Sequence, residues 1–308
     1  MTGSSRADRV LGSAPVALTA ATIGRHRFRT LAYHDIGDPA AFARQAQYLA
    51  EHWHPVSGAQ VADAVAGEGE LPARAVWVTF DDGRPDVVTD GLPILEEHGI
   101  PATLYVCPSV IDSGDPFWWQ AIEARPAAEV TVGGVARSGR PLVQALKVVP
   151  DAERRAVLEQ VLEQPATEVV PAQMDREQLD RWIASGREVG NHTWDHPILD
   201  RCTRAHQVEQ VRRAHEWLAE VLGTPPDLFA YPNGDRTEVT ASELFRLRYR
   251  TAPLFDHRLS SVDQEPFALS RLRLDAAAPL DRARAIVSGS HPAVFDVVRR
   301  IRGRASAA

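Results

Sequence analysis

Short apolar runs alternate with longer polar and apolar stretches along most of the chain. The runs lack a regular polar alternation, which is typical of strands buried on both faces of a parallel sheet. We therefore expect strands at residues 30–34, 75–80, 102–107, 188–191, 228–231, 249–252 and 267–274. Strands joined by helices predict an α/β fold, and about seven of them favour a distorted (β/α)7-type barrel. An open doubly wound sheet is the alternative.

Helical spacing of apolar residues fills the gaps between these runs. We expect helices at residues 40–53, 85–98, 175–185, 203–222 and 238–247. Asp175 and Gln178 form a D-x-x-Q capping pair at the start of one of them, and Gly186 follows its end. This helix therefore has a start and a stop signal in the sequence.

The stretch at about 111–174 breaks the strand–helix rhythm, because it is longer than one crossover helix requires. Within it, Gly133 and Gly134 lie between alternating residues and predict a two-residue hairpin turn. Residues 151–164 have helical spacing with acidic residues at the start. We interpret the stretch as a mostly helical insertion.

The domain organisation follows from these patterns. We expect one barrel domain at residues 29–290 that contains the insertion. An N-terminal arm would occupy residues 1–28, and a C-terminal helix and tail residues 291–308.

Composition narrows the class of protein and its partners. The 308 residues are 44% apolar and 24% charged, which is ordinary for a globular protein. A net charge of −7 gives no general attraction to nucleic acid or to an anionic membrane. The apolar stretch near the N-terminus is interrupted by Ser13 and Pro15, unlike a secretory signal, and no other stretch is long enough to span a membrane. We expect a cytoplasmic protein, with a signal peptide or anchor as the alternative.

Cys107 and Cys202 lack metal-ligand spacing, so we interpret them as buried or free thiols.

Two adjacent carboxylates follow the apolar run at residues 75–80. Asp81 and Asp82 lie in the sequence T-F-D-D-G, at a strand end where barrel enzymes keep their active sites. A turn with a helix cap ahead of Pro85 is the structural alternative.

Two histidines follow the run at residues 188–191. His192 and His196 are four residues apart, and Pro197 favours a turn there. Such a pair could share a cation, and a third ligand from Asp81 or Asp82 would complete a His2Asp catalytic metal site. Two surface histidines are the alternative, but each motif supplies what the other lacks.

These motifs, T-F-D-D-G and H-T-W-D-H, resemble the hallmarks of polysaccharide deacetylases of carbohydrate esterase family four. Tyr231-Pro232-Asn233-Gly234 corresponds to a later family turn. Ala230 stands where many members have arginine, and the family's aspartate–tryptophan motif is not recognisable. Tyr33-His34 is similar to an N-terminal motif of the poly-N-acetylglucosamine deacetylase subgroup. The resemblance covers roughly residues 29–110 and 175–275.

The resemblance implies a role for each matching residue. Asp82, His192 and His196 would hold a divalent metal, with Zn²⁺ favoured and Co²⁺, Ni²⁺, Fe²⁺ or Mn²⁺ as alternatives. Asp81 would be the general base, and the backbone N–H of Asn233 would hold the oxyanion.

In the subgroup, the early histidine is the general acid, so His34 is our candidate here, with His291 as a weaker rival. Arg271 could orient Asp81 in place of the missing arginine. Four aromatic residues could stack on a sugar: Phe117, Trp118, Trp119 and Trp194.

The expected function is metal-dependent hydrolysis of the N-acetyl group of an amino sugar, in an oligosaccharide, a polysaccharide or a sugar-bearing metabolite. The water would be activated by the metal, with an aspartate base and a histidine acid. The alternatives are an amidase or deformylase acting on a non-sugar amide, and an inactive carbohydrate-binding homologue.

Overall fold

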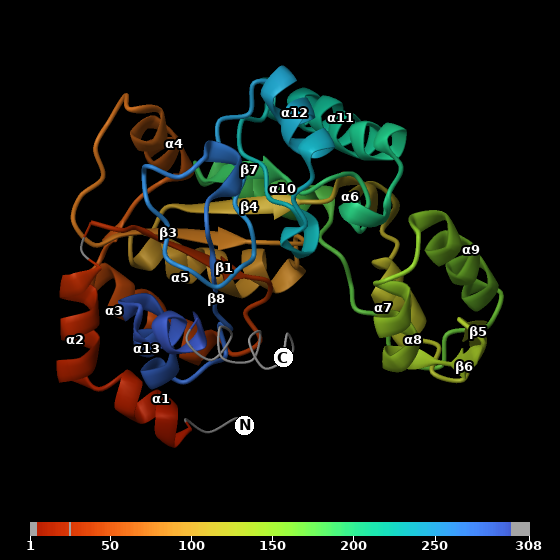
Figure 1. The fold of residues 1–308 in the computed structure, drawn as a ribbon, viewed down its shortest axis with the longest axis horizontal. Coiled ribbons are helices and arrows are strands. Elements are labelled where there is room, and N and C mark those ends of the chain that lie inside the picture. The colour runs from red at the N-terminus through yellow and green to blue at the C-terminus, as the bar shows by residue number, and fades with distance from the viewer. Residues whose placement is uncertain (1–4, 25, 297–308) are drawn as a thin grey trace, which may run out of the picture.

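A parallel sheet forms the centre of the molecule (Figure 1). The computed structural model describes residues 5–24 and 26–296. The strand order is β7-β4-β3-β1-β8, and β2 pairs with the start of β3. These strands are β1 (Arg29–Tyr33), β2 (His54–Pro55), β3 (Ala75–Phe80), β4 (Ala102–Val106), β7 (Glu188–Asn191) and β8 (Leu272–Arg273). All pairs in this sheet are parallel.

Single parallel bridges close the sheet into a ring. Asn191 pairs with Phe229, Leu228 with Thr251, and Pro253 with Leu269, so two short segments connect β7 back to the segment that carries β8. Seven parallel segments thus surround the core, which confirms the predicted α/β class and distorted barrel. The expected strands at 228–231 and 249–252 are present only as isolated bridges and not as continuous strands. Pro232, directly after the first of them, donates no ladder hydrogen bond and begins the turn Pro232–Gly234.

Helices cover the outside of the ring, and those at residues 58–66 and 280–288 were not expected from the sequence. The covering helices are α3 (Pro39–His52), α4 (Gly58–Ala66), α5 (Leu92–Glu97), α10 (Arg176–Ala184), α11 (Arg204–Leu222), α12 (Glu238–Arg246) and α13 (Leu280–Ser288). The capping box of Asp175 and Gln178 is present at the start of α10. The helix expected at 85–98 instead begins with a π-helical turn, η1 (Val87–Gly91), which continues directly into α5.

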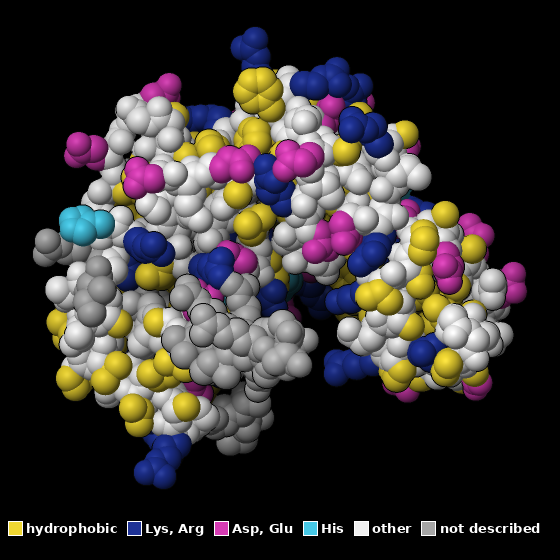
Figure 2. Space-filling model, viewed as in Figure 1, with side chains coloured by type: hydrophobic (Ala, Val, Ile, Leu, Met, Phe, Trp, Pro, Cys, Tyr) yellow, Lys and Arg dark blue, Asp and Glu magenta, His cyan; other side chains and the backbone are white. Residues whose placement is uncertain are grey.

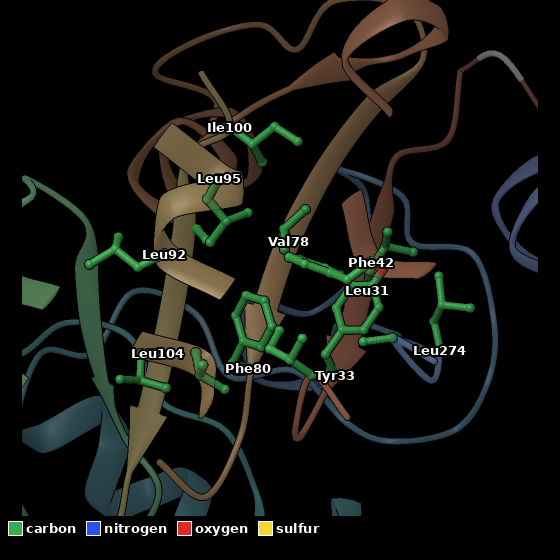
Figure 3. Close-up of a cluster of buried hydrophobic side chains, with 14 of the residues drawn as sticks. Leu31, Tyr33, Phe42, Val78, Phe80, Leu92, Leu95, Ile100, Leu104 and Leu274 are labelled. Carbon is green, nitrogen blue, oxygen red and sulfur yellow. The ribbon is translucent and has the colours of Figure 1, made fainter. Parts of the chain in front are cut away.

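The core lies between the central strands and their covering helices (Figure 3). Every residue of β1 and β3 is buried, as expected for strands packed on both faces. Tyr33 stacks on Phe80 with ring centroids 5.4 Å apart, and Phe42 of α3 meets both rings edge-on. Each such buried side chain contributes roughly 1.5–3 kcal/mol. This packing fixes the strand ends from which the site residues extend.

The 111–174 segment carries most of a separate small unit beside the ring (Figure 1). Its elements, together with the short helix that leads into it, are α6 (Pro108–Ser113), α7 (Trp118–Glu123), β5 (Val130–Val132), β6 (Val135–Arg137), α8 (Gly139–Leu146) and α9 (Asp151–Leu162). Gly133 and Gly134 both have positive φ, so the hairpin turn is present as predicted. A hydrophobic cluster of its own holds these elements together, with Ile122, Leu142, Leu146 and Val161 fully buried.

Two helices precede the first strand and pack near the end of the chain. They are α1 (Arg6–Leu11) and α2 (Ala14–Ile23), and α1 lies against α13 through an ion pair between Asp8 and Arg282 (3.5 Å). Residues 290–296 are helical, and the rest of the expected C-terminal helix and tail lies outside the described residues. Among the described residues, no helix is long and apolar enough to span a membrane.

Candidate active site

The two aspartates lie directly after β3, at the carboxyl end of the ring. The backbone N–H of Asp81 donates to the carbonyl of Tyr33 at the end of β1 (2.9 Å). His34 follows Tyr33, so both motifs open onto the same mouth. The strand pairing therefore explains why residues almost fifty positions apart meet here.

The two histidines after β7 face one oxygen of Asp82. The Nε2 atoms of His192 and His196 lie 3.5 Å and 3.4 Å from Asp82 Oδ1. All three side chains are buried, and their ligand atoms lie within 4.8 Å of one another. The two sequence motifs thus converge on one point.

The donor set fits a divalent cation. Asp82 Oδ1 is buried and has no hydrogen-bond partner in the described part of the chain, although it faces two imidazoles. His192 Nδ1 donates to the carbonyl of Ala230 (2.8 Å), which leaves Nε2 free to coordinate. Burial lowers the pKa of both His192 and His196 to about 4, so the rings are neutral at pH 7. Neutral imidazole is the form that binds metals.

Unusual backbone conformations concentrate in these two loops. Asp82, Thr193 and His196 have φ values of 71°, 69° and 57°. A positive φ is rare for any residue with a side chain and rarer still for β-branched Thr193, and each such position costs of order 1–3 kcal/mol. The surrounding structure must therefore hold these loops in place.

A buried arginine contacts the other aspartate. Arg271 Nη1 donates to Asp81 Oδ1 (2.7 Å), and Arg271 Nε donates to the carbonyl of Leu254 (2.8 Å). The side chains of Arg271 and Asp81 are 0% and 4% exposed. Burial alone would raise the pKa of Asp81, but the charges of Arg271, His192 and His34 hold it at about 2. Asp81 is therefore ionised at neutral pH, and its partner is the arginine that the sequence suggested in place of Ala230.

These groups line a cavity of about 670 Å³ between the ring and the 111–174 segment. Figure 2 shows a hollow there, bordered by lysine and arginine side chains. Six of the predicted site residues line the cavity: His34, Asp81, Asp82, His192, His196 and Asn233. His34 is exposed and lies edge-on to Phe255 at 5.5 Å. Asn233 occupies a left-handed turn with φ 54°.

The other candidates separate into those near the cavity and those outside it. Trp119 lines the cavity and is partly exposed, while Trp118 also reaches the lining but is only 6% exposed. Phe117 packs beneath Trp119, and Trp194 is covered by Arg213; neither lines this cavity. His291 contacts His257 (2.9 Å) and is also absent from the lining, so its candidacy as the acid finds no geometric support.

Sequence reasoning missed several lining residues. Lys147 and Gln144 come from the 111–174 segment, and Arg273 comes from β8. Asp235 also lines the cavity, and burial raises its pKa to about 6. The only sequence signal for Asp235 was its position directly after Asn233-Gly234, whereas nothing in the pattern marked the lysine or the glutamine.

Short segments of this chain are similar in sequence to known deacetylases. The peptidoglycan-N-acetylmuramic acid deacetylase PdaC of Bacillus subtilis is 31% identical over 68 residues, or 22% of this chain. The poly-beta-1,6-N-acetyl-D-glucosamine N-deacetylase of Escherichia coli K12 is 34% identical over 98 residues, or 28% of this chain. The matched segments span only 15% of each of these relatives.

Solved structures show the same fold. The deacetylase PplD of Streptococcus pyogenes, solved with acetate, has a TM-score of 0.56 at 20% identity, covering 83% of this chain and 96% of its own. IcaB from Ammonifex degensii has a TM-score of 0.56 at 20% identity, covering 86% and 98%. The polysaccharide deacetylase family model matches residues 68–252, more than half of the chain. With both hallmark motifs at one mouth of the barrel, this match shows that the chain belongs to the polysaccharide deacetylase family, a family of hydrolases.

Proposed function

We propose that this protein hydrolyses the N-acetyl group of an amino sugar, in an oligosaccharide, a polysaccharide or a sugar-bearing metabolite. One observation carries the proposal: Asp82, His192 and His196 converge on one point, beside an ionised Asp81 that is paired with Arg271. Amide hydrolysis needs a held acyl oxygen, a base for water and an acid for the departing nitrogen. The cavity contains a candidate for each need.

Asp82, His192 and His196 would hold the metal, with Zn²⁺ favoured by the ligand set. A divalent cation there supplies two effects, a lower pKa of the attacking water and polarisation of the acyl oxygen. Asp81 accepts the proton of the water, and Arg271 keeps this carboxylate ionised and oriented.

His34 and Asn233 complete the proposed machinery. His34 donates a proton to the departing nitrogen, and its exposure lets it recover a proton from solvent. The backbone N–H of Asn233 holds the developing oxyanion in the turn after Tyr231. Trp119 is the aromatic side chain best placed to stack on the sugar, because it is partly exposed in the cavity.

Two variants test the proposal. Asp81→Asn should lose acetate release from N-acetylated chito-oligosaccharides while keeping bound metal, and His192→Ala should lose both. Metal content is measured by mass spectrometry on protein purified without chelators. Full activity in Asp81→Asn would refute the assignment of the base.

Substrate class is tested in the same assay. Formate release from small formamides, without acetate release from sugars, would replace the sugar deacetylase by an amidase of non-sugar substrates. Sugar binding that survives chelation without any turnover would point to an inactive binding protein. Each outcome contradicts the proposal in a different way.

A further inference from the structure

The loop that carries the two histidines contacts the 111–174 segment through aromatic rings at His196 and through an ion pair at Asp195. The ring of Trp119 lies 4.7 Å from the ring of His196, edge to face. On the other side, Arg155 Nη2 of α9 lies 3.0 Å and 3.2 Å from the two carboxylate oxygens of Asp195. Asp195 is the residue immediately before His196, so both contacts act on the same part of the loop.

Arg155 is itself held in place by buried neighbours. Its Nε donates to Asp151 Oδ2 (2.7 Å), and the Asp151 side chain is only 7% exposed. Arg154 binds the other oxygen of Asp151, and His206 Nε2 lies 3.0 Å from Arg155 Nη2. Two guanidinium groups thus occupy the carboxylate of Asp151. They also argue against a second metal site at the nearby cluster of Asp151, Cys202 and His206.

The loop needs such support because its backbone is strained. Thr193 and His196 both have positive φ, and Asp195 lies between them. The backbone N–H of Asp195 donates to Gln210 Oε1 of α11 (3.1 Å), and the carbonyl of Trp194 accepts from the N–H of Ser109 (3.0 Å). The side chain of Asp195 is held only from α9 among the described contacts. Arg155 is therefore the fixed point on that side of the loop.

We propose that Arg155 is a positioning residue, which through its ion pair with Asp195 holds His196 in the geometry that binds the metal. This inference rests on the proposed metal site and gives the 111–174 segment a role in it. An isolated exposed ion pair would contribute little. This pair differs because Asp151 fixes the arginine and because the partner adjoins a metal ligand in a strained turn.

Metal affinity of the full chain provides the test. The proteins are stripped with chelator and titrated with Zn²⁺ by calorimetry, and thermal unfolding of the metal-free forms is recorded in parallel. Arg155→Ala should bind Zn²⁺ about tenfold more weakly, the lower end of the ~10–100-fold losses seen when partners of metal ligands are removed. Arg155→Lys should recover much of the affinity, because it keeps a cation at the same place.

Matched controls separate positioning from general stability. Arg176→Ala removes an equally short ion pair, to Asp180 on α10, away from the cavity. It should leave Zn²⁺ affinity unchanged. Adding Asp195→Asn to Arg155→Ala should cost little more affinity than Arg155→Ala alone, because the two residues act as one unit.

The possible outcomes are distinct. Wild-type affinity in Arg155→Ala, or a loss confined to the melting temperature of the metal-free protein, overturns the inference and leaves the proposed function standing. The inference is also overturned if the losses of Zn²⁺ affinity caused by Arg155→Ala and Asp195→Asn add fully in the double variant. A wild-type chain that binds no Zn²⁺, or that binds it equally well after His192→Ala, overturns the metal site and the inference together.

Discussion

Replacing Arg271 by methionine tests the electrostatics of the site without touching a metal ligand. In the native protein the guanidinium donates to Asp81 and to the carbonyl of Leu254 from a fully buried position. Methionine has a similar reach and no charge. The variant would leave the Asp81 carboxylate buried at 4% exposure without its cation.

The expected loss of stability is large. Breaking a buried ion pair by removing one partner costs about 3–5 kcal/mol. The pKa of Asp81 gives a second measure: its value of about 2, against 3.8 for the free side chain, corresponds to about 2 kcal/mol of stabilisation of the ionised form. We therefore expect Arg271→Met to lower the free energy of unfolding at pH 7 by about 2–5 kcal/mol.

The same pKa gives the sign of the pH dependence. A carboxyl group with a lowered folded pKa stabilises the protein above its unfolded pKa, and this contribution is lost as pH falls through the folded value. In Arg271→Met, burial without the cation raises the pKa of Asp81, so the gap in stability between wild type and variant should be full only above that raised pKa and should narrow as pH falls toward 2.

Urea unfolding of chelator-treated protein measures both effects. The double variant Arg271→Met/Asp81→Asn is the control, since it leaves no unpaired buried charge and should recover most of the lost stability. A loss under about 1 kcal/mol for Arg271→Met, or a gap that does not change with pH, would refute the reasoning.

Two further predictions concern packing and the substrate. Gly190→Ala should cost about 1–3 kcal/mol in thermal unfolding, because a Cβ there would lie 2.4 Å from the ring of Tyr105; an unchanged melting temperature would contradict the close approach of β7 to that ring. Trp119→Ala should raise KM for N-acetylated sugars about 3–10-fold with a smaller effect on kcat, if stacking is worth ~0.5–1.5 kcal/mol; an unchanged KM in acetate-release kinetics would remove Trp119 from the sugar site.

The local elements were predictable because their signals are local. Apolar runs located every segment of the ring, and a D-x-x-Q pair marked the start of α10. The hairpin at Gly133 and Gly134 followed from turn chemistry alone. The convergence of the aspartate and histidine motifs was also predictable, since parallel strands bring their carboxyl ends to one edge.

Long-range partners were harder to predict. The sequence suggested Arg271 as the partner of Asp81, but only as what could replace the missing arginine, because the two lie 190 residues apart and meet through the pairing of β8 with β1. The π-helical turn η1 has no distinct sequence pattern, so residues 87–91 read as ordinary helix. The contribution of Lys147 to the cavity depends on how the 111–174 segment docks, which periodicity does not encode.

Closure of the ring by lone bridges affects how the protein would lose activity on warming. The wall from β7 round to β8 is paired by isolated bridges and not by continuous ladders, so it should open before the strands on the opposite side separate. Arg271 lies directly before β8, at the end of this bridged wall. Heat would then detach the counter-ion of the base while most of the helices persist, so inactivation should precede the loss of circular dichroism.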